Sequence, residues 1–318
     1  MNKDILTKLF RGSLTTFLLA TLATSCYQHD PIRDKLNQRE NNKATPKPTP
    51  SPEEKPGEDL PSQPETGTNT FLFDFESWRK LHQYEIPTAP QPFDPDFWTS
   101  GSNEGFKLIP GKQLPYPVSR LDNSIKGKGV RIQSRPGAVF LGMGSHLVAG
   151  SMYSGSVNTA QLVSKPLESN HFGRIFPFRP LSVRGYYRYI AGEKFIDGTP
   201  KGGGKELPGN MDKGVIAAVF YEVNSKEETL DGSNLYTSGK IVAIGKMELG
   251  NTDGWQHFNF ALSPVSAEKY KEINLQLKKY KLALIFSSSY LGDLYQGAIG
   301  STLDIDEIEI EVTDKNPK

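Results

Sequence analysis

The chain has 318 residues, 36% of them hydrophobic and 23% charged, so it is long enough for one large domain or two small ones. A formal net charge of +1 gives no electrostatic support for nucleic-acid binding. The 30 glycines and 23 prolines favour a turn-rich all-β fold, and the single cysteine excludes an intramolecular disulfide.

The N-terminus has the pattern of an export signal. Basic residues precede the short apolar run Leu14–Ala23, which is too short to span a bilayer and predicts a signal peptide over residues 1–25. Small residues then lead to Cys26, an arrangement that resembles the lipobox of bacterial lipoproteins. We therefore expect an exported protein, anchored by a lipid on Cys26 at the outer membrane or cell surface. The alternative is an ordinary signal peptide with a chance cysteine.

Residues 26–69 differ sharply in composition from the rest of the chain. The segment Thr45–Pro64 is rich in proline and charged residues and almost free of apolar ones, so it cannot bury enough surface to offset its ordering entropy. Proline favours the extended polyproline II conformation. We expect a disordered, Pro-rich stalk that holds a domain away from the membrane.

A folded domain is expected over residues 70–313, followed by a tail at 314–318. Phe71, Phe73 and Phe75 alternate with polar or exposed positions, which predicts a strand with an aromatic inner face. The apolar run Val215–Val223 predicts a buried central strand. The sequence predicts further strands at Gly129–Ile132, Ala138–Leu141, Thr159–Val163, Leu181–Ile190, Lys240–Met247, Trp255–Leu262 and Lys281–Ser287.

These short strands predict a jelly-roll-like antiparallel β-sandwich. A short helix is expected within Ala267–Leu277, whereas the two prolines of His171–Pro180 predict irregular structure. In the last strand, the aliphatic positions change phase between Asp306 and Glu307, which predicts a β-bulge. The loop Tyr290–Gly300 before this strand is the expected functional surface of the domain.

Four segments carry a family resemblance: Phe73–Trp78 (FDFESW), Ser100–Phe106 (SGSNEGF), Phe176–Tyr189 (FPFRPLSVRGYYRY) and Ser287–Ile310. They resemble the putative carbohydrate metabolism domain, a family of exported β-sandwich lipoproteins of Gram-negative bacteria that live on complex glycans. The similarity spans about Thr70–Val312 and implies fold more specifically than function. It brings no established catalytic residues.

More distantly, the first and last strands resemble those of jelly-roll carbohydrate-binding modules, many of which hold a structural Ca²⁺ between these strands. Hard cations need several converging oxygen ligands. The candidate ligands for such an ion are Asp74, Glu76, Asp304, Asp306 and Glu307. The alternative is a solvated acidic edge that discourages strand-to-strand aggregation.

A glycan site needs aromatic platforms beside hydrogen-bonding groups, because sugar rings present apolar faces rimmed by hydroxyls. The candidates in expected loops are the aromatic residues Trp98, Tyr116, Tyr153, Tyr290 and Tyr295 and the polar residues Asn103, Glu104, Arg179 and Asp293. The alternative is that these aromatics cap the ends of the sandwich as satellite core. Trp78 and Trp255 are expected in the core.

Catalytic motifs are missing from the sequence: there is no GxSxG or HExxH, and the five histidines lack metal-ligand spacing. The leading hypothesis is therefore a non-catalytic, lipid-anchored protein that binds a polysaccharide or other glycan. It contacts the membrane only through its lipid and binds no nucleic acid. The alternatives are a glycoside hydrolase or lyase with an unrecognised acid pair, and an adhesion or fimbrial assembly component.

Overall fold

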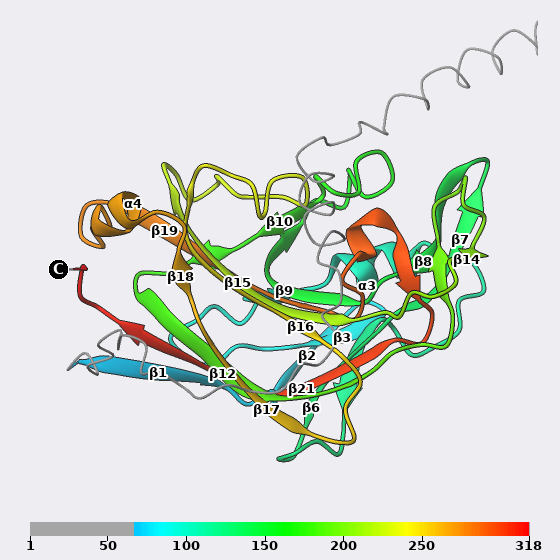
Figure 1. The fold of residues 1–318 in the computed structure, drawn as a ribbon, viewed down its shortest axis with the longest axis horizontal. Helices are drawn as coiled ribbons and strands as arrows, with labels where there is room; N and C mark the ends of the chain where they lie inside the picture. Colours follow the sequence, from blue (N-terminus) through cyan, green and yellow to red (C-terminus); the bar gives the residue numbers. More distant parts are fainter. Residues whose placement is uncertain (1–66, 318) are drawn as a thin grey trace, which may run out of the picture. The chain divides into compact units, whose positions relative to one another are not determined.

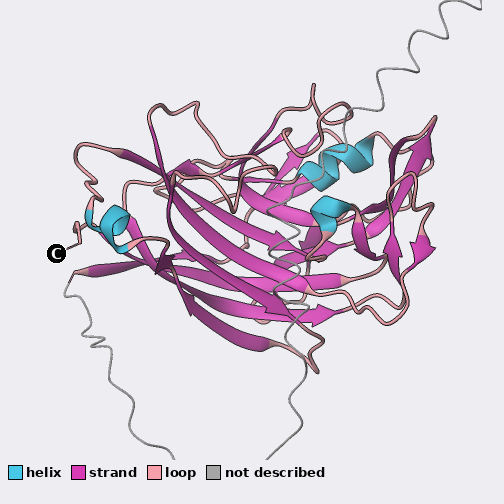
Figure 2. Cartoon of the chain, turned by 45° about the horizontal axis from the view of Figure 1, so that its top comes forward, coloured by secondary structure: helices cyan, strands magenta, loops and turns pink. Residues whose placement is uncertain are grey.

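Two antiparallel sheets stack in layers to form the body of the protein (Figures 1 and 2). The computed structural model describes residues 67–317, so the predicted signal peptide, Cys26 and almost the whole stalk lie outside the described residues. The predicted all-β, jelly-roll-like sandwich is confirmed, because every strand pair is antiparallel and helices are short. Within residues 67–317, no helix is long and apolar enough to span a membrane.

The lower layer in Figure 1 is a six-stranded sheet with the order β17-β12-β21-β6-β5, to which β1 adds beside β21. Its strands are β1 (Thr68–Phe73), β5 (Val118–Leu121), β6 (Gly129–Gln133), β12 (Arg179–Ile190), β17 (Gln256–Ala261) and β21 (Thr302–Thr313). The pairing of β1 with β21 confirms that the last strand completes a sheet that the first strand begins.

The other layer is an eight-stranded sheet with the order β10-β9-β19-β15-β16-β18, to which β11 adds beside β19 and β4 beside β9. Its strands are β4 (Trp98–Thr99), β9 (Ser151–Val157), β10 (Asn170–Phe172), β11 (Arg174–Ile175), β15 (Gly214–Val223), β16 (Ile241–Leu249), β18 (Ser263–Pro264) and β19 (Lys279–Ser287). The predicted central strand is β15, and nearly all of its side chains are buried.

Small elements surround the two layers. They are the hairpins β2 (Trp78–Leu81)–β3 (Tyr84–Pro87) and β7 (Arg135–Phe140)–β8 (Met143–Val148), the small sheet of β13 (Phe195–Asp197), β14 (Lys205–Glu206) and β20 (Gln296–Ala298), the helices α3 (Gly101–Lys107) and α4 (Ala267–Lys271), and the 3₁₀ helix η1 (Gly292–Leu294). The helix α4 confirms the short helix expected there.

Buried side chains form two clusters on opposite faces of the eight-stranded sheet. Alternation along β19 places Leu282, Leu284 and Phe286 in the main core between the sheets. The residues between them, including Ala283 and Ile285, join a second cluster on the other face, with Leu230 and Leu235 from the loop after β15. This sheet is therefore covered on both sides, which explains the continuous apolar run of β15.

The predicted β-bulge in the last strand is confirmed. Opposite β12, the register shifts between Arg184 and Tyr186, and Glu307 has a left-handed φ of 48°. A Cβ on Gly185 would lie 2.9 Å from the carbonyl oxygen of Glu307 and 3.1 Å from Cα of Ile308, so only glycine fits opposite the bulge.

Three local predictions are wrong. Thr159–Val163 forms turns rather than a strand, and the segment His171–Pro180 contains β11 and most of β10 despite its prolines. Trp255, predicted in the core, precedes β17 on the outer face of the six-stranded sheet, where it is partly exposed. The guanidinium of Arg188 lies 5.3 Å from the centre of its ring, so a cation–π contact covers the indole there.

Candidate functional site

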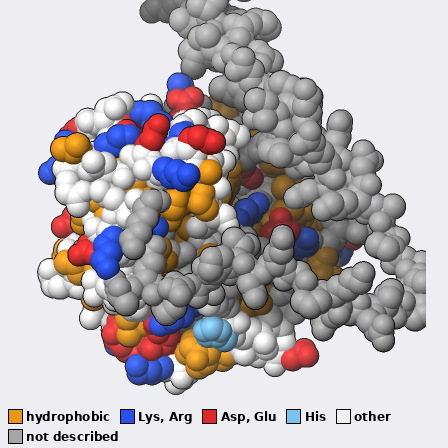
Figure 3. All heavy atoms as spheres, turned by 60° about the vertical axis from the view of Figure 1, so that its left-hand side comes forward, with side chains coloured by type: hydrophobic (Ala, Val, Ile, Leu, Met, Phe, Trp, Pro, Cys, Tyr) orange, Lys and Arg blue, Asp and Glu red, His pale blue; other side chains and the backbone are white. Residues whose placement is uncertain are grey.

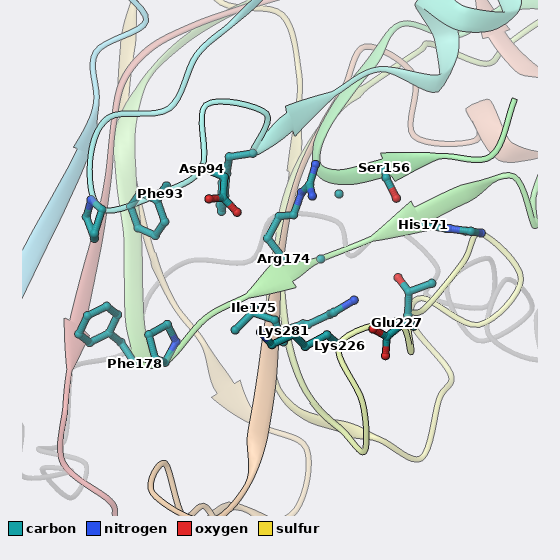
Figure 4. Close-up of a pocket in the computed structure, with 16 residues that line it drawn as sticks. Phe93, Asp94, Ser156, His171, Arg174, Ile175, Phe178, Lys226, Glu227 and Lys281 are labelled. Atoms are coloured by element: carbon teal, nitrogen blue, oxygen red, sulfur yellow. The ribbon is translucent and has the colours of Figure 1, made fainter.

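A pocket of about 460 Å³ lies where two loops meet one edge of the eight-stranded sheet (Figure 4). One loop precedes β4 and contributes Pro92, Phe93, Asp94 and Phe97, and the other follows β15 and contributes Lys226, Glu227 and Thr229. Between them lie the end of β9, the segment from β10 to the start of β12, and Lys281 of β19. The volume is within the range of small-ligand sites.

One side of the pocket is apolar. It is lined by Phe93, Phe97 and Phe178 together with prolines and Ile175. Phe93 is held in place by ring contacts, including a parallel stack on Phe176 at 5.9 Å. Phe93 and Phe97 are buried, at 6% and 2% exposure, and support the wall from behind. The surface that is open to the apolar face of a ligand is the partly exposed ring of Phe178 with Ile175 and the prolines.

Glycines allow the strands behind the pocket to approach each other closely. Gly173 adopts a φ of +95°, and a Cβ there would lie 2.6 Å from the hydroxyl oxygen of Tyr221. At Gly155, a Cβ would lie only 2.1 Å from the carbonyl oxygen of His171. Larger residues at either position would push β9, β10 and the lining segment apart.

The other side of the pocket is charged. Arg174, Lys226 and Lys281 contribute three cations, whereas Asp94 and Glu227 contribute two carboxylates. Arg174 donates from Nη2 to the backbone oxygen of Asp96 at 2.6 Å and to its Oδ2 at 3.0 Å. In Figure 4, Asp94 lies with Arg174 on one side of the pocket, and Glu227 and Lys226 lie across from them.

Lys281 is the most deeply placed of these cations. It is only 6% exposed, although it belongs to a strand whose other central residues are apolar. Burial lowers the pKa of its ammonium group, and the nearby positive charge of Arg174 lowers it further, whereas Glu227 opposes the shift. On the face shown in Figure 3, basic, acidic and hydrophobic side chains are interspersed.

Three predicted aromatic platforms are wrong because their rings are buried. Trp98 is 0% exposed and packs in the main core, with its ring 5.0 Å from Phe73. Tyr153 is 1% exposed and donates its hydroxyl to Oδ1 of Asn170 at 2.6 Å. Tyr116, at 7% exposure, is also core. No sugar ring has access to these side chains, as the satellite-core alternative anticipated.

The predicted polar partners Asn103, Glu104 and Arg179 are used inside the protein instead. Asn103 is fully buried in α3, donating to the carbonyl of Val118 at 2.9 Å and accepting from its N–H at 2.8 Å. This pair of bonds fixes α3 to β5. The prediction of Asn103 as a glycan contact is therefore wrong.

Glu104 and Arg179 are also engaged within the fold. Glu104 accepts from the hydroxyl of Tyr84 at 2.6 Å and pairs with Lys107 at 2.5 Å, and only 13% of its side chain is exposed. Arg179 is 4% exposed and donates to the hydroxyl of Tyr270 at 2.7 Å. The buried Arg179 is not available to a glycan, so that prediction is wrong. Glu104 is engaged but partly exposed, and its glycan-binding role stays a prediction.

The loop with Tyr290, Asp293 and Tyr295 is partly exposed, and the ammonium of Lys213 lies 5.5 Å from the ring centre of Tyr290. It does not line the pocket described above. A glycan-binding role for these three residues stays a prediction.

A buried carboxylate anchors this loop. Oδ2 of Asp212 accepts from the hydroxyls of Ser289 at 2.6 Å and Ser301 at 2.7 Å, and from the N–H of Ala298 at 2.7 Å. Its Oδ1 accepts from the N–H of Lys213. The bonds tie both ends of the loop to the start of β15. Desolvation raises the pKa of Asp212, although the hydrogen bonds oppose the shift.

The predicted calcium ligands do not converge on one point. Asp304 accepts hydrogen bonds from the guanidinium groups of both Arg131, at 2.8 and 2.9 Å, and Arg188, at 2.5 and 3.2 Å. Within residues 67–317, no group of three or more acidic, histidine or cysteine side chains is placed to hold a metal ion.

The other predicted ligands are likewise engaged by neighbouring backbone or by lysines. Asp74 accepts from the N–H of Glu76, and Glu76 from that of Lys128. Asp306 accepts from the N–H of Lys126, whose ammonium lies 3.3 Å from Glu307. These contacts do not fit a shared cation, and the Ca²⁺ site stays a prediction.

The sequence did not reveal the segment His171–Phe178, which contributes more lining residues to the pocket than any other segment. The feature of the sequence that could have indicated a binding segment is the combination of aromatic and basic residues in HFGRIFPF. That combination is ambiguous by itself, because Phe172 and Phe176 are buried while His171, Arg174 and Phe178 face the pocket.

The fold is that of an all-β sandwich protein, and a ligand-sized pocket lies beside its eight-stranded sheet. The model of the family described as "Putative carbohydrate metabolism domain" matches residues 74–311. The chain therefore belongs to this family, as the sequence motifs indicated. No curated protein is similar to it in sequence.

Two solved structures are similar in sequence and fold. One is titled a putative glycoside hydrolase from Bacteroides thetaiotaomicron VPI-5482. It is 32% identical with a TM-score of 0.67, and the alignment covers 76% of this chain and 70% of that chain. The other, with the same description, is from Bacteroides vulgatus ATCC 8482. It is 28% identical with a TM-score of 0.64, and the alignment covers 76% of this chain and 98% of that chain.

A family 11 carbohydrate-binding module from Clostridium thermocellum, in complex with a β-1,3-1,4-mixed-linked tetrasaccharide, is 8% identical with a TM-score of 0.31. The alignment covers 76% of this chain and 94% of that chain. This similarity is too weak to place a ligand on the present chain.

Proposed function

We propose that this protein recognises a glycan in the pocket beside β9, β11 and β19, without cleaving it. The supporting observation is the pairing of a fixed aromatic wall with hydrogen-bonding and charged groups in one ligand-sized cavity, in a chain of a carbohydrate-related family. Sugars need both kinds of surface, an apolar one for the ring face and a polar one for the hydroxyls.

Substitution of the apolar wall tests this function. We expect Phe178→Ala to weaken binding to a polysaccharide on affinity gels or glycan arrays about tenfold, because it removes one ring from the wall. The matched control is Phe140→Ala at the tip of the β7–β8 hairpin, where the phenyl group is 74% exposed and lies outside the pocket.

Circular dichroism and the thermal midpoint establish that both variants are folded. Equal affinities of the folded Phe178 and Phe140 variants would refute the assignment to this pocket. Failure of the wild-type protein to bind any glycan would refute the function itself.

A glycoside hydrolase is the second candidate, because both similar solved structures carry that description and Asp94 and Glu227 both line the pocket. Hydrolysis needs one carboxyl group that retains its proton. The hydrogen bond from Ser225 lowers the pKa of Glu227, which does not suit a general acid. Release of reducing sugar from a polysaccharide panel, abolished in Asp94→Asn or Glu227→Gln, would establish the enzyme instead.

We further propose that the domain is displayed on the cell by a lipid on Cys26, a residue outside the described part of the chain. The support is the apolar run followed by small residues and the cysteine. Metabolic labelling with a radioactive fatty acid should mark the wild-type protein, and Cys26→Ala should lose the label and leave the membrane fraction. Labelling that persists in Cys26→Ala would refute this anchor.

A further inference from the structure

Lys281 occupies an unusual position for a charged residue. It lies on the outer face of β19, where its cross-strand neighbours are Tyr221 of β15 and Ile175 of β11. The next residues on the same face, Ala283 and Ile285, belong to the second buried cluster. The pocket is therefore where the ammonium of Lys281 reaches an open space.

This ammonium has no ion-pair partner in the described part of the chain. Glu227 lines the same pocket, but the contact between them is electrostatic only, and the nearby guanidinium of Arg174 repels Lys281. A buried charge is costly unless it is paired or loses its proton. The lowered pKa of Lys281 agrees with this cost.

The guanidinium of Arg174 is already engaged on the other side of the pocket. Its Nη2 donates to the backbone oxygen and to the carboxylate of Asp96, and its Nε is buried. Because the Nε is closed to a ligand, Arg174 adds positive charge near Lys281 rather than a free donor.

Lys281 is therefore the buried cation of this pocket that has no ion pair among residues 67–317. Arg174 is paired with Asp96, and it lies opposite Leu282 in the register of β11 and β19, whereas Lys281 lies opposite Ile175. The side chains of Arg174 and Lys281 therefore leave the sheet on opposite faces. An anionic group in the pocket would pair with the ammonium of Lys281.

We infer that the glycan recognised in this pocket carries an anionic substituent, a carboxylate or a sulfate ester, which pairs with Lys281. This inference rests on the proposed glycan-binding function and specifies its ligand class. The apolar wall packs against the sugar ring, and the cationic side selects acidic over neutral sugars.

The test compares matched oligosaccharides by titration calorimetry with the full domain. One pair is an oligogalacturonate and its fully methyl-esterified form, and the other is a sulfated galactan oligosaccharide and its desulfated form. We expect at least one charged member to bind about 10–100-fold more tightly than its neutral counterpart, and which pair shows the preference distinguishes carboxylate from sulfate.

Variants of Lys281 complete the test. Lys281→Met fills the same buried space without charge and should lose the preference for the charged member, whereas Lys281→Arg should retain part of it. Exposed Lys271 of α4 provides the matched control, Lys271→Met. Because the substitution removes an unpaired buried charge, Lys281→Met should also raise the thermal midpoint of the free protein, which shows that the variant is folded.

The possible outcomes separate the two proposals. Equal binding of charged and neutral members, unchanged in Lys281→Met, would overturn the inference and leave glycan recognition intact. Absence of binding to every oligosaccharide and polysaccharide would overturn both. A charge preference that disappears equally in Lys271→Met would indicate non-specific attraction and would also overturn the inference.

Discussion

At the scale of single residues, the chemistry of this protein depends on polar groups that the fold removes from water. Asp212 and Lys281 are 1% and 6% exposed, respectively. Asp212 is surrounded by donors and has a structural role, whereas Lys281 faces a pocket and has no ion-pair partner among residues 67–317. The contrast between them distinguishes an anchor from a candidate binding group.

The anchoring role of Asp212 predicts a large loss of stability on substitution. Asp212→Ala would leave buried donors from Ser289, Ala298 and Ser301 without an acceptor. We expect the free energy of unfolding to fall by about 3 kcal/mol in urea denaturation. Asp253→Ala, which removes an exposed carboxylate, is the control and should change the stability by less than about 0.5 kcal/mol.

The raised pKa of Asp212 also predicts a pH dependence. The folded protein retains a proton on this carboxyl group at pH values where the unfolded chain, with a pKa near 3.8, has lost it. The contribution of Asp212 to stability is therefore largest below pH 3.8 and decreases as the pH rises through the raised pKa.

Asp212→Asn lacks this titration, so the difference in unfolding free energy between it and the wild type should change over that window. Titrations of other groups, such as Asp306, cancel in the difference. A difference that is constant with pH would contradict the raised pKa.

At the scale of elements, the last strand shows how a pattern in the sequence encodes a backbone irregularity. The aliphatic side chains of β21 face the core on both sides of the bulge because one extra residue resets the alternation. Glu307 is that residue, and its left-handed φ costs energy for any side chain with a Cβ. The bulge is predictable because burial on one face demands it.

Substitutions at the bulge test whether the left-handed backbone of Glu307 is strained. Glu307→Gly should leave the stability within about 0.5 kcal/mol of the wild type, because glycine adopts the left-handed region without strain and offsets the loss of the contact with Lys126. Glu307→Val should destabilise by about 1–2 kcal/mol, since a β-branched residue is strained there. Glu311→Val, in the regular part of β21, is the control. Similar stabilities for the two valine variants would argue against strain at Glu307.

At the scale of the whole molecule, the pocket joins segments that are far apart in the sequence. Residues 92–97, 171–178 and 226–229 and Lys281 meet only in the folded sandwich. A ligand bound there contacts the folded state and not the unfolded chain, so its binding must stabilise the entire domain.

Binding is therefore expected to raise the thermal midpoint. At a concentration of 100 times its Kd, an acidic oligosaccharide should stabilise the domain by about 2.7 kcal/mol, which is roughly 5–10 °C for a domain of this size. The shift should be much smaller in Lys281→Met. An equal shift in that variant would place the ligand elsewhere on the protein, such as the loop of Tyr290, Asp293 and Tyr295.

The sequence by itself determined the layered β-architecture, the pairing of the first and last strands, the bulge at Glu307 and the family. Alternation of apolar and polar residues depends on which face of a strand is buried, and ordered motifs identify the family, so both can be found in the sequence. It did not determine the site. Whether Trp98 or Phe178 contacts solvent depends on which distant strands cover each ring, and a charged residue such as Lys281 looks the same in sequence whether it is solvated or buried. Only the tertiary structure decided that Trp98, Tyr116 and Tyr153 are core, and that Lys281 faces a pocket without an ion pair among residues 67–317, since burial and pairing are properties of segments brought together by folding.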